Sequence, residues 1–118
     1  DGAVIGVGRN RVEERRSPLA HAEMEALQAA LAKMGEKRLP DAELYCTLEP
    51  CFLCAGAILH TRVRRVVFGA LDPKFGAVRS LGNVLQDERL NHRCEVLEGV
   101  SADESAELLR AFFRQKRR

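Results

Sequence analysis

Two short clusters of reactive residues place the strongest constraint on the fold of this chain. The first is His-Ala-Glu at residues 21–23, and the second is Pro-Cys-Phe-Leu-Cys at residues 50–54. An imidazole, a carboxylate and two thiols can act together only where folding brings both clusters to one place. Any fold assigned to the chain therefore has to carry residues 50–54 back to residues 21–23.

The apolar pattern predicts strands that alternate with helices. Strands are expected at residues 3–8, 44–48, 63–68 and 94–97, and helices at about 20–34, 51–60 and 83–89. Met24, Leu27, Leu31 and Met34 recur at helical spacing, which indicates a face turned toward the core. Residues 9–18 and 72–76 are expected to form a polar loop and a turn. This alternation predicts a layered α/β fold.

A last helix is expected near the C-terminus. Ser-Ala-Asp-Glu at residues 101–104 fits a capping box, and apolar residues follow it at helical spacing. Those apolar residues are Leu108, Leu109, Phe112 and Phe113.

Length and composition bound the class of protein. A chain of 118 residues with 46% hydrophobic and 31% charged residues is expected to be one globular domain covering residues 1–118. Its longest apolar stretch, residues 52–59, is too short to span a bilayer, and no secretory pattern opens the chain. We therefore expect no membrane association and a cytoplasmic protein.

The two ends of the chain carry further expectations. Asp1-Gly2 before an apolar run is typical of a hairpin turn, so a strand is expected upstream of Asp1. The basic residues at 114–118 either neutralise phosphates of a nucleic acid or complement the C-terminal dipole of a helix.

The spacing within each cluster points to a metal held between two helix starts. His21 and Glu23 are two residues apart, so they face different sides of a helix and converge only beyond its N-terminus. Cys51 and Cys54 share one face of the next helix, whose N-terminus favours thiolates. We predict a catalytic zinc bound by His21, Cys51 and Cys54, with one position open and Glu23 free to move protons.

Two other interpretations of these residues stay open at this point. A Cys-x-x-Cys pair can be a redox pair, although that leaves His21 and Glu23 without a role. A closed structural zinc site needs a fourth ligand, which His60 or His92 could supply. The remaining thiols, Cys46 and Cys94, lie in apolar runs and are expected to be buried.

The sequence resembles the bacterial tRNA-specific adenosine deaminases in several separate blocks. The two clusters together match the signature of zinc-dependent nucleobase deaminases. The more specific blocks are residues 47–62 (Thr-Leu-Glu-Pro-Cys-Phe-Leu-Cys-Ala-Gly-Ala-Ile-Leu-His-Thr-Arg), residues 66–70, Asp72, Lys74, residues 76–77, residues 91–93 and residues 112–114.

The resemblance implies a cytidine-deaminase-like fold, a three-layer α/β/α sandwich with a mixed five-stranded sheet. It implies a homodimer that binds a tRNA anticodon stem-loop and converts the wobble adenosine to inosine. One zinc per subunit would activate a water, with Glu23 as the proton shuttle. A helix and a strand normally precede the position of Asp1 in this family, and the strand lies inside the sheet.

The resemblance also implies residues that contact the substrate. Asn10 would hold the target base together with the backbone of Ala22, and Asp72 would contact the ribose. Without the resemblance, Asn10 and Asp72 would both be interpreted as turn residues. The complete set of implied substrate contacts is Asn10, Ala22, Asp72, Lys74, Phe113 and Arg114.

Two rival functions share much of this pattern. A zinc deaminase of a free base or nucleotide, of the guanine or cytidine type, would use the same metal site without a basic RNA-binding tail. A zinc-stabilised RNA-binding module would bind RNA equally well with Glu23 replaced, and it would release no ammonia.

Overall fold

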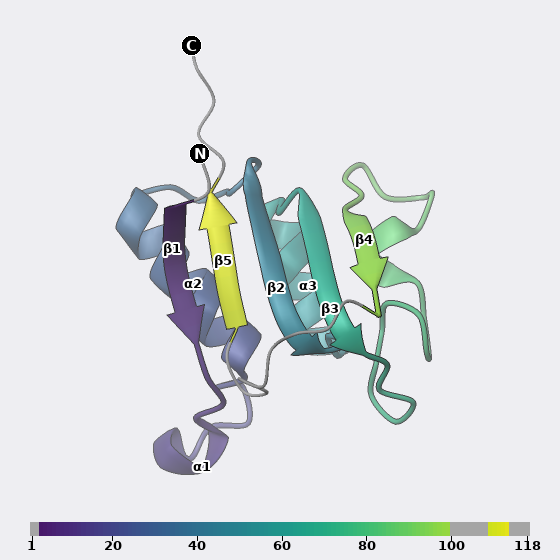
Figure 1. Ribbon diagram of the computed structural model, residues 1–118, viewed down its shortest axis with the longest axis horizontal. Coiled ribbons are helices and arrows are strands. Elements are labelled where there is room, and N and C mark those ends of the chain that lie inside the picture. The colour runs from purple at the N-terminus through teal and green to yellow at the C-terminus, as the bar shows by residue number, and fades with distance from the viewer. Residues whose placement is uncertain (1–2, 100–108, 114–118) are drawn as a thin grey trace.

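The fold is seen in a computed structural model, which describes residues 3–99 and, as backbone, residues 109–113. Five strands and the helices between them follow one another along the chain (Figure 1). The elements are β1 (Ala3–Gly8), α1 (Val12–Arg15), α2 (Ala22–Met34), β2 (Ala42–Leu48), α3 (Phe52–Thr61), β3 (Arg65–Ala70), the 3₁₀ helix η1 (Val84–Gln86), β4 (Glu95–Glu98) and β5 (Leu109–Phe113).

The strands form one mixed sheet in the order β1-β5-β2-β3-β4. Strands β2, β3 and β4 run parallel, whereas β5 is antiparallel to both of its neighbours. Strands β1, β2 and β3 therefore all end at the same edge of the sheet (Figure 1). The expected α/β class and mixed sheet are confirmed.

The prediction of a C-terminal helix is wrong for residues 109–113, which are the part of that segment described by the structure. Leu109–Phe113 is a strand that pairs with β1 on one side and β2 on the other. A short apolar run fits a helix or a buried strand equally well by periodicity alone. Here the unpaired backbone groups of β1 and β2 are satisfied only by a strand between them. The expected capping box at 101–104 lies outside the described residues.

Helices α2 and α3 cover the same face of the sheet and pack against each other (Figure 1). Helix α2 lies behind β1 and β5, and α3 lies behind β2 and β3. The described elements thus form two layers of the expected three-layer sandwich. Residues 109–113, which were expected in the C-terminal helix, belong to the sheet as β5.

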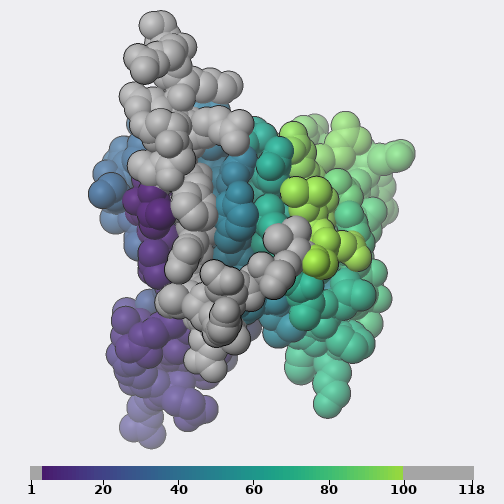
Figure 2. Space-filling model, in the orientation of Figure 1, coloured from purple at the N-terminus to yellow at the C-terminus, as the bar shows by residue number. Residues whose placement is uncertain are grey.

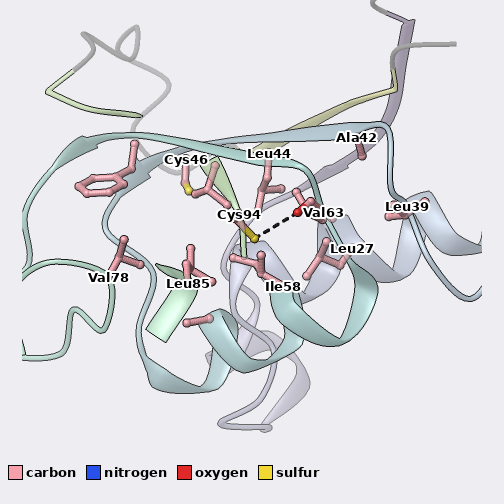
Figure 3. Close-up of a cluster of buried hydrophobic side chains, with 14 of the residues drawn as sticks. Leu27, Leu39, Ala42, Leu44, Cys46, Ile58, Val63, Val78, Leu85 and Cys94 are labelled. Carbon is pink, nitrogen blue, oxygen red and sulfur yellow. Dashed lines mark hydrogen bonds between the residues drawn. The ribbon is translucent and has the colours of Figure 1, made fainter. Parts of the chain in front are cut away.

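Alternate residues of the central strands supply the core between sheet and helices (Figure 3). Leu44 of β2, Phe68 of β3 and Ile58 of α3 are fully buried there. The expected burial of Cys46 and Cys94 is confirmed.

The expected core face of α2 is confirmed for three of its four residues. Leu27 is buried, and Leu31 and Met34 pack against the core while partly exposed. Met24 is only half-buried and stays outside this cluster.

Two smaller differences separate the expected elements from the observed ones. The expected loop at residues 9–18 contains the single helical turn of α1. The expected helix near residues 83–89 is the shorter η1. In the described parts of the chain, no helix combines the length and the apolar character needed to cross a membrane.

Two glycines of β1 let α2 approach the strand closely. A Cβ atom on Gly6 would lie 2.6 Å from the backbone oxygen of Ala26. One on Gly8 would lie 2.3 Å from the backbone oxygen of Ala22 and 2.5 Å from the nitrogen of Ala26. Because backbone atoms cannot move aside as a flexible side chain can, these contacts fix the distance between β1 and the start of α2.

We predict that Gly8→Ala lowers the free energy of unfolding by about 2 to 3 kcal/mol, because the added methyl overpacks a rigid contact. Val7→Ala is the matched control, since Val7 is the adjacent residue of the strand and is exposed. It is expected to change stability by less than about 1 kcal/mol. Urea unfolding followed by circular dichroism measures both, and equal losses would contradict the assignment.

Candidate metal centre and pocket

Three loops meet at the edge where β1, β2 and β3 end. The first begins after Gly8, the second after Leu48 and the third after Ala70. Open α/β sheets place their ligand sites at the carboxyl ends of parallel strands. The space-filling view shows the α1 region and the segment after β3 projecting beyond this edge of the sheet (Figure 2). The expected meeting of residues 21–23 and 50–54 also occurs here.

Two helix N-termini bring the three expected metal ligands together. His21 is the N-cap residue of α2, and Cys51 is the N-cap residue of α3, both with extended backbone. Cys54 follows in the first turn of α3. The Nδ1 atom of His21 lies 3.6 Å from the Sγ of Cys51 and 3.5 Å from the Sγ of Cys54. The side chain of His21 makes no hydrogen bond to the start of its own helix, and the side chains of His21 and Cys51 face each other across the cluster.

These distances fit a four-coordinate zinc ion. Zinc holds nitrogen at about 2.0 Å and sulfur at about 2.3 Å, so tetrahedral nitrogen and sulfur ligands lie about 3.5 Å apart. All three donor atoms lie within 4.8 Å of one another. Two thiols and one imidazole are also a donor set that zinc prefers.

The closed structural site lacks its fourth ligand in the described part of the chain. The group of candidate ligands there contains His21, Cys51 and Cys54, and neither His60 nor His92. The Nε2 of His92 lies 3.0 Å from the carbonyl oxygen of Val63, which precedes β3 and so lies away from the metal centre. A three-ligand set leaves one coordination position for a water or a substrate.

The two thiols differ in their ease of ionisation. A hydrogen bond from the Cys54 thiol, with further ones from the N–H groups of Cys54 and Leu53 and the charge of His21, lowers the pKa of Cys51 to about 5. The pKa of Cys54 is raised because its thiol donates that hydrogen bond and is buried. One thiol of the pair is thus ready to bind a metal as a thiolate at neutral pH.

Glu23 completes the cluster from the first turn of α2. Burial is the largest influence on its carboxyl group and raises its pKa, and the nearby Cys51 acts in the same direction. Hydrogen bonds from its own backbone N–H and from Cys54, and the charge of His21, oppose that shift. A carboxyl group held in this way is suited to both accepting and giving up a proton.

The metal centre lies at one side of a pocket with a volume of about 810 Å³. Asn10, Ala22 and Asp72, which were expected to contact substrate, all line this pocket together with His21 and Glu23. The other residues that line it are Arg9, Glu13, Glu14, Cys46, Thr47, Leu48, Glu49, Cys51 and Phe75.

Asn10 and Asp72 also have the turn roles that residue type alone suggested. The Oδ1 of Asn10 accepts a hydrogen bond from the N–H of Val12, at 2.9 Å. The Oδ1 of Asp72 accepts hydrogen bonds from the N–H groups of Lys74 and Phe75, at 3.1 and 3.3 Å. In each residue one side-chain oxygen thus shapes the loop that lines the pocket.

The structure gives less information on the other three expected substrate contacts. Lys74 is exposed and is not among the residues that line the pocket. Phe113 belongs to β5, where only the backbone is described. Arg114 lies outside the described residues.

Sequence reasoning missed two residues of this site, Phe75 and Glu49. Phe75 lines the pocket with 66% of its side chain exposed. The sequence offered one indication of Phe75: it is a single aromatic residue within a turn sequence, where its ring has no obvious part in the core. Glu49 was noted only as part of the block at residues 47–62, and an acid directly before the Pro-Cys of the second cluster was the available signal.

Glu49 is buried, with 2% of its surface exposed, and its carboxylate accepts five hydrogen bonds. Although burial opposes ionisation, the hydrogen bonds from Ser80 and from the N–H groups of Arg79 and Asp72 lower the pKa of Glu49 to about 2. The carboxylate is therefore a fixed negative charge within the loop that follows β3.

Comparison with known proteins agrees with this site. A family model described as MafB19-like deaminase matches residues 1–117, so the class of protein is a deaminase. A tRNA-specific adenosine deaminase of Bacillus subtilis (strain 168) is 47% identical over 118 residues, which cover all of this chain and 73% of that protein. The chain belongs to the family of tRNA-specific adenosine deaminases.

Solved structures give the same picture. One from a study of A-to-I editing by tRNA:A34 deaminases has a TM-score of 0.79 and 43% identity, covering 84% of this chain and 76% of that chain. A guanine deaminase from Bacillus subtilis has a TM-score of 0.59 and 41% identity, covering 60% of this chain and 45% of that chain.

We predict that the purified protein binds about one zinc ion per chain, as a site with three protein ligands would. Replacing His21, Cys51 or Cys54 by alanine is expected to remove most of it. Cys94→Ser is the matched control, since the Cys94 thiol contacts the carbonyl oxygen of Val63 and the ring of His92 rather than the cluster, and a hydroxyl can make the same contacts. Elemental analysis measures the metal, and full zinc content in the Cys51→Ala protein would contradict the site.

Proposed function

We propose that residues 1–118 act as one zinc-dependent deaminase domain that converts adenosine to inosine at the wobble position of a tRNA anticodon. The observation that carries the proposal is the cluster of His21, Cys51 and Cys54 beside Glu23 at the wall of an open pocket. The similarity of the whole chain to tRNA-specific adenosine deaminases supports adenosine in tRNA as the substrate. Such a substrate places the reaction in the cytoplasm.

The reaction exchanges an exocyclic amine for the oxygen of a water. His21, Cys51 and Cys54 would hold the zinc, which when bound lowers the pKa of that water. Glu23 accepts a proton from the water and passes it to N1 of the adenine ring. The water oxygen forms a bond to C6, and Glu23 carries the second proton to the departing amine, which leaves as ammonia.

The residues that line the pocket are suited to contact a nucleobase that is not stacked on its neighbours in the RNA. Asn10 and Ala22 line the pocket, and so do Asp72 and Phe75 of the loop that follows β3. Aromatic rings stack on unpaired bases, and anticodon loops present such bases without the cost of breaking a pair. We propose that Lys74, Phe113 and Arg114 contact the neighbouring RNA.

We predict that an anticodon stem-loop with a wobble adenosine acquires inosine at that position when incubated with the zinc-loaded protein. Sequencing after reverse transcription reads inosine as guanosine and reports the site of conversion. Glu23→Gln is expected to retain zinc and to lower the rate by about a hundredfold or more, since it keeps the shape of the side chain and removes its proton transfer.

A free-base deaminase is the second candidate function, and the similarity to a guanine deaminase structure is the observation that favours it. The same protein is therefore assayed for ammonia release from free guanine and cytidine. Release from either, with no conversion of the stem-loop, would replace the tRNA by a small molecule as the substrate. RNA binding without ammonia release from any substrate would leave a non-enzymatic RNA-binding module.

We propose that the protein is a homodimer whose interface includes the exposed apolar start of α3. Phe52 and Leu53 are 52% and 39% exposed there. The Phe52 ring lies next to Gly82, where an added Cβ would be 3.3 Å from it, and the neighbouring Leu81 is 54% exposed. Contiguous exposed apolar side chains of this kind are typical of protein interfaces.

We predict that the wild-type protein sediments as a dimer and that Leu81→Asp shifts it toward the monomer, because a charge would be buried in an apolar contact. Leu97→Asp is the matched control, since Leu97 is a similarly exposed leucine of β4. Analytical ultracentrifugation measures both. A dimer that resists Leu81→Asp but dissociates with Leu97→Asp would move the interface to the sheet.

A further inference from the structure

The carboxylate of Glu49 accepts hydrogen bonds from several residues of the loop that follows β3. Its Oε1 accepts hydrogen bonds from the N–H of Asp72, at 2.9 Å, and from the hydroxyl of Ser80, at 2.5 Å. Its Oε2 accepts from the N–H groups of Val78, Arg79 and Ser80, at 3.0, 2.6 and 2.8 Å. One buried side chain thus joins both ends of the segment from residue 72 to residue 80.

The backbone around Glu49 ties the same segment to the metal centre. The N–H of Glu49 donates to the carbonyl oxygen of Ala70, at 2.8 Å, and the N–H of Ala77 donates to that of Pro50, at 2.9 Å. Cys51, one of the three candidate zinc ligands, forms an isolated bridge with Gly76. The chain from Glu49 to Cys51 is therefore joined by backbone contacts to Ala70, Gly76 and Ala77.

Gly76 shows how tightly the loop is wrapped around this carboxylate. A Cβ atom there would lie 2.2 Å from the carboxyl carbon of Glu49 and within 2.5 Å of both of its oxygens. Those atoms are held by five hydrogen bonds, so they cannot move aside as a free side chain would. The absence of a side chain at residue 76 is what allows the loop to close on Glu49.

We propose that Glu49 is a positioning residue that holds Asp72 and Phe75 over the pocket at a fixed distance from Cys51. It contacts neither the reacting atoms nor the donor atoms of the metal ligands, and it acts through the loop. Asp72 is positioned directly, because its own N–H donates to Glu49. Phe75 is positioned through Asp72, because the N–H of Phe75 donates to the Asp72 side chain. The role in substrate binding rests on the proposed function, whereas the ordering of the loop does not.

Glu49→Gln tests this role with little change of size. An amide has one oxygen where the carboxylate has two, so its NH₂ group has to face N–H donors. If the amide oxygen takes the place of Oε2, it keeps the hydrogen bonds from the N–H groups of Val78, Arg79 and Ser80. The NH₂ group then faces the N–H of Asp72, which is left without an acceptor. Burial without a partner is costly for a backbone N–H, so the loop is expected to detach at Asp72.

Glu43→Gln is the matched control. Glu43 is also a buried glutamate of the β2 region, at 6% exposure, and it pairs with Arg64 and Arg65. Its substitution is expected to destabilise the protein without reaching the loop. Ser80→Ala is a milder second variant, since it removes one of the five hydrogen bonds and keeps the charge; it carries the test if Glu49→Gln does not fold.

Hydrogen–deuterium exchange of the peptide covering residues 72–80 is the first readout, and it needs no substrate. Glu49→Gln is expected to speed exchange there by about tenfold or more, and Ser80→Ala by less, with Glu43→Gln at the wild-type rate. Zinc content is expected to stay at the wild-type level in all three. Unchanged exchange in Glu49→Gln, or loss of its zinc, would overturn the proposal.

Kinetics on the stem-loop give the second readout. Glu49→Gln is expected to lower kcat/KM by about tenfold to a hundredfold, mainly through KM. In a background that carries Asp72→Ala and Phe75→Ala, the same substitution is expected to cost less than about threefold, because the groups that it positions are gone. Equal costs in both backgrounds would contradict action through the loop. If the wild type converts no stem-loop, the proposed function fails while the exchange result still decides the role of Glu49 in the loop.

Discussion

The parallel pairing of β2 with β3 is the contact on which the rest of this structure depends. It aligns Leu48 with Ala70, so the segments that follow the two strands leave the sheet side by side. One segment carries Cys51 and the other carries Asp72. Because β1 ends at the same edge, the start of α2 also arrives there with His21. The three candidate metal ligands and a wall of the pocket are thus brought together by the pairing of the strands.

The site places two carboxylates in opposite environments within the same small region. Burial raises the pKa of Glu23, and few hydrogen bonds oppose it. Five hydrogen bonds hold Glu49 ionised, with a pKa of about 2, although it is buried as well. A carboxyl group with a raised pKa accepts a proton more readily than one that is held so firmly ionised. Their environments therefore suit Glu23 to the proton transfer proposed for it and Glu49 to the positioning role proposed for it.

The sequence was sufficient to predict that His21, Cys51 and Cys54 come together, because the spacing within each cluster places these residues at helix starts. Cys51 and Cys54 are both fixed by one helix start, and His21 by another. The C-terminal segment was predicted wrongly because its state depends on distant strands: Leu109–Phe113 is extended between β1 and β2. Glu49 was missed for the same reason, since its partners lie at residues 72–80. A local sequence pattern predicts which residues lie at a helix start. Whether a segment becomes a strand, and what a residue such as Glu49 binds, depends on hydrogen bonds to residues far away in the sequence.

Close backbone approach fixes both walls of the pocket, and in each case a glycine permits it. Gly8 lets β1 touch the start of α2, which carries His21 and Glu23. Gly76 lets the loop after β3 close on Glu49, next to Cys51. A side chain at either position would separate a wall from the metal centre rather than alter any reacting group. The geometry of this candidate site therefore depends on the positions that lack a side chain as well as on the residues proposed to carry out the chemistry.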